Sequence, residues 1–232
     1  MSLASGREVG HVVPGGLGHG TPFFLSYSRA AEGTSKPGAE FDPDQLVERF
    51  FRDLSVNVKE LLGPRVGAEP GFMDRNMRGG TQWNEELLRA LGTCQILVAL
   101  LSPGYLSSEW CGMEWDAFAK REVRRSSEIA SPHQGCIIPV IWVPVGPESG
   151  LPPPIRTGML FAPESKPEPD VVSQYRGNGI FGLLRMRQDT SYQIVAWQLA
   201  MHIARVYRGQ QVEEREFRPE DLRNVFGGGT GE

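Results

Sequence analysis

One carboxylate of this chain, Glu114, lies between two aromatic residues at a spacing that could alter its acidity. Glu114 lies four residues after Trp110 and four before Phe118, and residues four apart share one face of an α-helix. A carboxyl group that aromatic side chains shield from water has a raised pKa. The spacing alone favours a structural interpretation, in which Trp110 and Phe118 belong to the core and Glu114 is a solvated or salt-bridged charge.

The elements that must position Glu114 alternate between strands and helices. Apolar runs predict buried strands at 22–27, 71–74, 95–102 and 136–145, and an edge strand at 183–186. Amphipathic patterns predict helices over 44–62, from 81, over 109–124 and over 191–208. This order predicts an α/β fold, with an open parallel sheet of about five strands and helices on both faces. Such sheets bind ligands at the carboxyl ends of their strands, here 26–29, 74–75 and 102–105.

A chain of 232 residues is predicted to form one domain, over residues 21–209. Residues 1–20 are glycine-rich without apolar periodicity, which predicts a flexible leader. Proline and glycine are frequent in 146–180, which predicts an irregular surface segment. Residues 210–232 are charged and then glycine-rich, so a flexible tail is expected there, with local packing of Phe217, Leu222 and Phe226 as the alternative.

Charge and composition exclude several classes of function. A net charge of -4 gives no basic field for nucleic acid or an anionic membrane. No signal peptide begins the chain, and no apolar stretch approaches the roughly 20 residues that span a bilayer. We therefore expect a cytoplasmic protein.

Metal sites and disulfides are not expected. The cysteines are odd in number and have no CxxC spacing, and the histidines have no ligand spacing. The basic residues at the end of the helix around Glu114 are expected to form a solvated face. They are Lys120, Arg121, Arg124 and Arg125.

Four blocks, in the same order, resemble motifs of the Toll/interleukin-1 receptor (TIR) domain. They are FLSYSR at 24–29, Asp74 with a glycine-bearing loop and Trp83, LLSPGY at 100–105, and SEWCGME at 108–114. The sequence of residues 111–118, CGMEWDAF, most resembles that of actinobacterial TIR-like proteins of the FxsC type. The resemblance implies a flavodoxin-like fold and covers about residues 22–145, and more loosely continues to 208.

In TIR enzymes the glutamate of the W-C-x-x-E motif is catalytic, and here it is Glu114. The resemblance therefore implies a bacterial NAD+ glycohydrolase (NADase) of defence or signalling, a hydrolase with NAD+ as substrate and no cofactor. Nicotinamide leaves a cationic pyridinium as a neutral molecule and needs no general acid. A carboxylate then stabilises the ribosyl cation-like transition state.

The resemblance also implies the residues around the substrate. Trp110 is expected to stack on a ring of NAD+, and Ser28 and Arg29 to contact phosphate or ribose. Three further candidates are Tyr27, Asp74 and Cys111. A structural role for Asp74 stays open, and an inert, buried Cys111 is favoured over an activated thiol.

TIR enzymes self-associate, because the BB loop of a neighbouring domain, which corresponds here to the glycine-bearing loop after Asp74, completes the pocket. The loop residues expected to do so are Arg75, Asn76, Arg78, Gly79, Gly80 and Trp83, although packing is the favoured role of Trp83. Two alternatives stay open: an interaction module without turnover, which joins other TIR domains or another partner, and a sensor that binds a nucleotide without cleaving it. A separate sensor chain is an expected partner.

Overall fold

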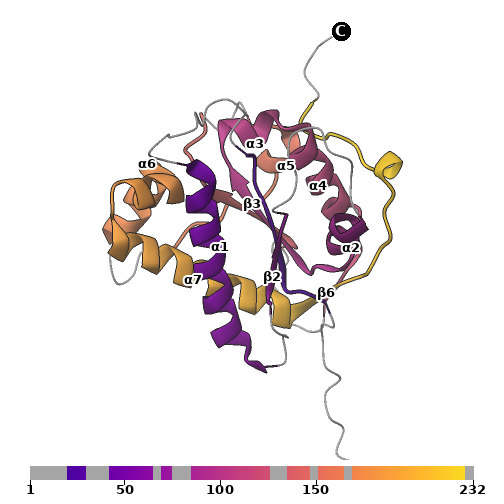
Figure 1. Cartoon of the computed structure of the whole chain (residues 1–232), viewed down its shortest axis with the longest axis horizontal. Helices are drawn as coiled ribbons and strands as arrows, with labels where there is room; N and C mark the ends of the chain where they lie inside the picture. The colour runs from indigo at the N-terminus through magenta and orange to yellow at the C-terminus, as the bar shows by residue number, and fades with distance from the viewer. Residues whose placement is uncertain are drawn as a thin grey trace, which may run out of the picture.

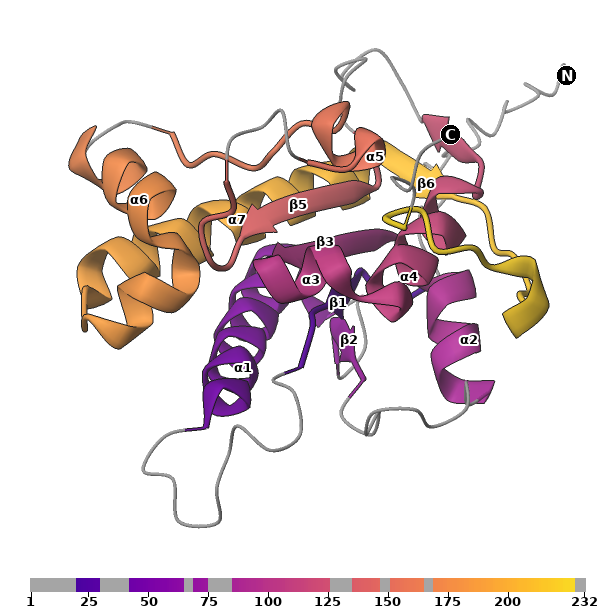
Figure 2. The same cartoon turned by 90° about the horizontal axis from the view of Figure 1, so that it is seen from above.

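A four-stranded parallel sheet lies at the centre of the molecule (Figures 1 and 2). The computed structural model describes residues 20–29, 42–64, 69–74, 85–125, 135–146, 151–164 and 169–227. The strands are β1 (Phe23–Ser26), β2 (Gly71–Met73), β3 (Ile96–Leu101) and β5 (Ile137–Ile141), in the order β2-β1-β3-β5. The predicted parallel α/β fold is thus confirmed.

Layers of helices on both faces explain the unbroken apolar strands. All six residues of β3 are buried, because β3 is a central strand covered on both sides. One face carries α1 (Pro43–Leu62), α6 (Pro169–Arg185) and α7 (Asp189–Gly209). The other carries α2 (Glu85–Thr93), α3 (Pro103–Ser107), α4 (Glu109–Ala119) and α5 (Pro153–Arg156). Among the helices that the structure describes, none has the length and apolar content needed to cross a membrane.

The second half of the domain differs from the prediction. The predicted edge strand at 183–186 is wrong, because residues 183–185 form the end of α6 and residue 186 lies in the turn that follows. Leu183 and Leu184 are buried against α7 and the sheet. A short apolar run fits a strand and a buried helix equally well. The irregular segment predicted over 146–180 contains α5 and most of α6. At Gly179 (φ 63°, ψ 176°) the backbone is not helical and α6 kinks. Glycine is required there, because a Cβ would overlap the Trp142 carbonyl.

The C-terminal strap, which we define as residues 210–227, is ordered where a flexible tail was predicted. It begins with β6 (Gln210–Val212), which pairs antiparallel with β4 (Val123–Arg125), so α4 ends at Ala119 rather than near 124. It then runs along α2 and α4 (Figure 1). Phe217 and Leu222 are buried, and these apolar anchors hold the charged segment in place.

Gly112 lets the strap approach α4 closely, since a Cβ at this position would overlap Asn224 Oδ1. We expect Gly112→Ala to displace the strap and to lower the free energy of unfolding by about 1–3 kcal/mol, measured by urea denaturation. Gly177→Ala is the control, because Gly177 lies in α6 with open space around its Cα. Because alanine has a higher helix propensity than glycine, Gly177→Ala is expected to leave the free energy of unfolding unchanged or to raise it slightly. Equal effects of the two substitutions would contradict the close approach.

Arg121 is buried rather than solvated, with 5% of its surface exposed. Its Nη1 donates to the carbonyls of Leu91 (3.0 Å) and Cys94 (2.5 Å), and its Nε donates to the carbonyl of Glu213 (3.0 Å). Burial lowers the pKa of the guanidinium. The expected solvated basic face is therefore wrong at Arg121, which ties the end of α2 to the strap.

Arg121→Met is expected to destabilise the protein by about 3 kcal/mol, because it leaves buried carbonyls without a donor. The matched control is Arg124→Met, because the Arg124 side chain is 75% exposed and its ion pair with Glu213 lies at the surface. That change is expected to cost less than about 1 kcal/mol. Urea denaturation midpoints measure both effects. A small loss of stability in Arg121→Met would mean that water replaces the guanidinium as hydrogen-bond donor to the carbonyls.

Candidate functional site

Two capped turns bring Glu114 to the carboxyl edge of the sheet. Ser102 follows β3 and caps α3, with its Oγ accepting from the Tyr105 amide at 3.1 Å. Ser108 then caps α4, with its Oγ accepting from the Cys111 amide at 3.3 Å. Because α4 begins beside the ends of the strands, Glu114 in its second turn meets the last residue of β1.

The carboxyl group of Glu114 belongs to a buried hydrogen-bonded group with Ser26 and Tyr105. Ser26 Oγ donates to Glu114 Oε2 and lies 3.1 Å from the hydroxyl of Tyr105. The exposed fractions are 1% for Ser26, 0% for Tyr105 and 6% for Glu114. Glu114 is thus a buried, hydrogen-bonded carboxyl, and the solvated surface charge that spacing alone favoured is wrong.

Burial sets the protonation of this site. Burial raises the pKa of Glu114 to about 8, the Ser26 hydrogen bond opposes this rise, and the negative charge of Asp74 adds to it. Burial also holds the pKa of Tyr105 well above its ordinary value. Glu114 is therefore mostly protonated at pH 7 in the isolated chain and ionises just above neutrality.

Four of the predicted substrate-binding residues gather at the ends of β1 and β2. Arg29 Nη2 donates to the Asp74 carbonyl at 3.0 Å, and the guanidinium carbon lies 6.0 Å from the centre of the Tyr27 ring. Burial raises the pKa of Tyr27 to about 12. Ser28, the next residue, is half-buried, with its Oγ near where a Cβ on Gly104 would lie. The structure assembles these residues at one edge, and their role in binding stays a prediction.

Trp110 and Cys111 occupy the first turn of α4 and differ in exposure. Trp110 is half-buried, whereas Cys111 is only 2% exposed. Burial and the neighbouring Glu114 raise the pKa of the Cys111 thiol. A buried thiol with a raised pKa is a poor nucleophile, so the favoured inert cysteine is supported and Trp110 is the more accessible of the two.

The predicted self-association loop lies outside the described residues. This holds for Arg75, Asn76, Arg78, Gly79, Gly80 and Trp83. The expected leader lies outside them too, up to residue 19. Their roles stay predictions.

Ser26 and Tyr105 are the site residues that the sequence analysis did not name. Both lie in the segments 26–29 and 102–105, where the sequence predicted ligand binding at the carboxyl ends of strands. This position in the fold was the sequence feature that could have identified them. Ser26 is 88 positions from Glu114 and 79 from Tyr105 along the chain. Only the pairing of β1 with β3 brings these residues together, with Ser26 opposite Ala99.

Comparison with known proteins agrees with the fold and with the motifs. Residues 52–157 match the family model described as TIR domain. This segment contains Asp74, Tyr105 and Glu114, whereas Ser26 precedes it. No curated protein and no solved structure matches the chain. The chain is therefore similar to the TIR domain family over residues 52–157.

Proposed function

We propose that this protein is an NAD+ glycohydrolase and that Glu114 is its catalytic carboxylate. The observation that carries the proposal is a carboxyl group buried at the carboxyl edge of a parallel sheet, where such folds bind ligands. Ser26 fixes the orientation of this group, and the charge of Asp74 lies near enough to affect its ionisation. Tyr27, Ser28, Arg29 and Trp110 would bind the nucleotide beside it.

The reaction needs one anion and no acid. The bond between ribose C1′ and the nicotinamide nitrogen breaks, and its electron pair leaves with the nitrogen, so the pyridinium becomes neutral nicotinamide. The ionised Glu114 would stabilise the positive charge that develops on the ribose. Water then adds to C1′ and loses a proton, which gives ADP-ribose; an internal nucleophile would give a cyclic product instead.

The raised pKa makes the proposed activity dependent on pH. Only ionised Glu114 stabilises a cation, so kcat/KM for nicotinamide release is expected to rise with pH and to level off above about 8. Ser26→Ala removes the hydrogen bond that favours ionisation, and its profile is expected to move to higher pH. Ser107→Ala is the control, because this exposed hydroxyl bonds to the Pro103 carbonyl instead. A profile unchanged by Ser26→Ala would contradict the role of Ser26.

We further propose that the domain self-associates through loop residues 75–83 and acts in the cytoplasm, in bacterial defence or signalling. The experiment that tests the activity is nicotinamide release from NAD+ at high protein concentration, where assembly is favoured.

One observation favours a second function, an interaction module without turnover. Glu114 is hydrogen-bonded, buried and mostly protonated at pH 7, as a structural carboxyl group would be. A folded, concentrated protein that self-associates but releases no nicotinamide would favour this module over the enzyme.

A further inference from the structure

Strand β2 leaves one edge of the sheet open. It is the first strand in the order β2-β1-β3-β5, and within the described part of the chain no strand pairs with its outer edge. The Phe23 amide donates to the Pro70 carbonyl at 3.2 Å, so the backbone groups of Pro70 and Phe72 face β1. Since these groups alternate along a strand, those of Gly71 and Met73 face outward. An open edge of this kind is a template for another strand.

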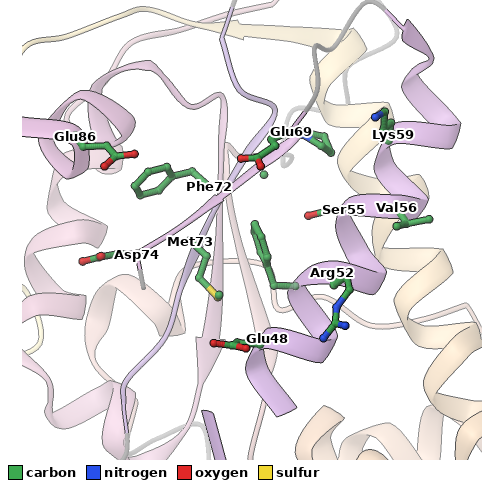
Figure 3. Close-up of a pocket in the computed structure, with 13 residues that line it drawn as sticks. Glu48, Arg52, Ser55, Val56, Lys59, Glu69, Phe72, Met73, Asp74 and Glu86 are labelled. Carbon is green, nitrogen blue, oxygen red and sulfur yellow. The ribbon is translucent and has the colours of Figure 1, made fainter. Parts of the chain in front are cut away.

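A groove of about 700 Å³ follows this edge, between α1 and the first turn of α2. Figure 3 shows Arg52, Ser55 and Val56 on the α1 side and Glu86 across β2 from them. Val56 is 56% exposed, so its apolar side chain is accessible beside the groove. Ser55 Oγ is covered, yet it makes no hydrogen bond within the ranges that the structure describes. The groove therefore offers apolar side chains beside unpaired backbone of the described strand.

Acidic side chains dominate the charge of the groove. Among the lining residues that the structure describes, four carry carboxylates and two, Arg52 and Lys59, carry positive charges. The carboxylates are Glu48, Glu69, Asp74 and Glu86. Two copies of this edge, if paired with each other, would bring like charges together at a cost in free energy. A partner with basic side chains is favoured by the same charges.

We propose that the β2 groove binds an extended, basic segment of a partner protein, which adds to the sheet as a fifth strand. The backbone groups of Gly71 and Met73 pair with the added strand, and its lysine or arginine side chains reach Glu48 and Glu86. Binding of this type takes affinity from the main chain and specificity from alternate side chains. β2 has three residues, so the ladder is short and the complex is transient. The groove shares Asp74 with the candidate site around Glu114, but the proposal does not depend on NADase activity.

The probe is a set of fluorescein-labelled nine-residue peptides in which Lys or Arg alternates with Val or Thr, titrated with the full chain and followed by fluorescence anisotropy. Two N-methylated forms of the best binder test the strand geometry. Methyl groups on the amides that face β2 should weaken binding at least tenfold, whereas methyl groups on the other alternate amides should leave it within twofold. Equal effects of both patterns would overturn strand addition, as would the absence of binding by every peptide of the set.

Charge reversal tests the site. The double variant Glu48→Lys with Glu86→Lys is expected to weaken peptide binding at least tenfold. The control, Glu60→Lys with Glu220→Lys, makes the same charge change at exposed residues outside the groove, and it should have little effect. Equal weakening in both variants would mean that only net charge matters and would overturn the proposal. A dimer detected by sedimentation that the peptide dissociates would also overturn it, in favour of a second copy in the groove.

Discussion

Glu114→Gln is expected to slow nicotinamide release from NAD+ by at least about 10²-fold, because the amide keeps the shape of the side chain but carries no charge to stabilise a ribosyl cation. The loss should appear in kcat, since the charge matters most in the transition state. The substitution also removes the ionisation on which the pH profile depends. Any remaining activity should therefore lack the rise with pH that ends near 8.

The matched control for this prediction is Glu109→Gln. Glu109 lies on the same helix, in its first turn, and is exposed. It is expected to retain wild-type activity. The assay is best done at high protein concentration, because the proposed self-association would otherwise limit turnover. Full activity in a folded Glu114→Gln variant would exclude this carboxylate as the catalytic group.

The second prediction concerns stability. The same substitution that lowers activity is expected to raise the free energy of unfolding. Glu114 titrates near 4.5 in an unfolded chain and near 8 in the folded protein, so between these values the folded state holds a proton that the unfolded state has lost. The contribution of Glu114 to the free energy of unfolding is therefore expected to be highest below about pH 4.5 and to fall as pH rises towards 8. The expected loss is about 3–5 kcal/mol.

Glu114→Gln should lack this loss, because the amide cannot ionise. The variant is expected to be more stable than the wild type at pH 8 and to differ least from it near pH 4.5. Urea denaturation at a series of pH values measures the difference, with Glu109→Gln as the reference for other titrating groups. Parallel curves for wild type and Glu114→Gln would show that Glu114 ionises in the folded state as it does in water.

Together the two predictions describe one residue that lowers stability and supplies the proposed activity. An ionisable group buried without a cationic partner destabilises the fold near neutral pH. Such a residue is hard to explain as packing alone, since glutamine or an apolar side chain would fill the same space at lower cost. The combination of lost activity and gained stability in one variant would therefore be strong support for the enzyme.

Most of the sheet and of the first helices was predictable from local pattern. Continuous apolar runs at β1, β3 and β5 indicate strands buried on both faces, and the spacing of apolar residues in α1 and α7 indicates helices against that sheet. The later region was less predictable. The run Leu183–Leu184 is too short for its period to separate helix from strand, and the strap has only isolated anchors such as Phe217.

Local sequence patterns were enough to predict the parallel α/β class, the position of Glu114 on a helix that begins at the carboxyl edge, and the resemblance to TIR domains. These depend on neighbours within a few positions along the chain. Three features became visible only in the folded molecule: Ser26 holds Glu114, Arg121 is buried under the strap, and no described strand pairs with the outer edge of β2. Those features depend on which strands pair, in which register, and on which segments cross them. Side chains about 80 or more positions apart, such as Ser26 and Glu114, leave no local pattern that reveals their contact.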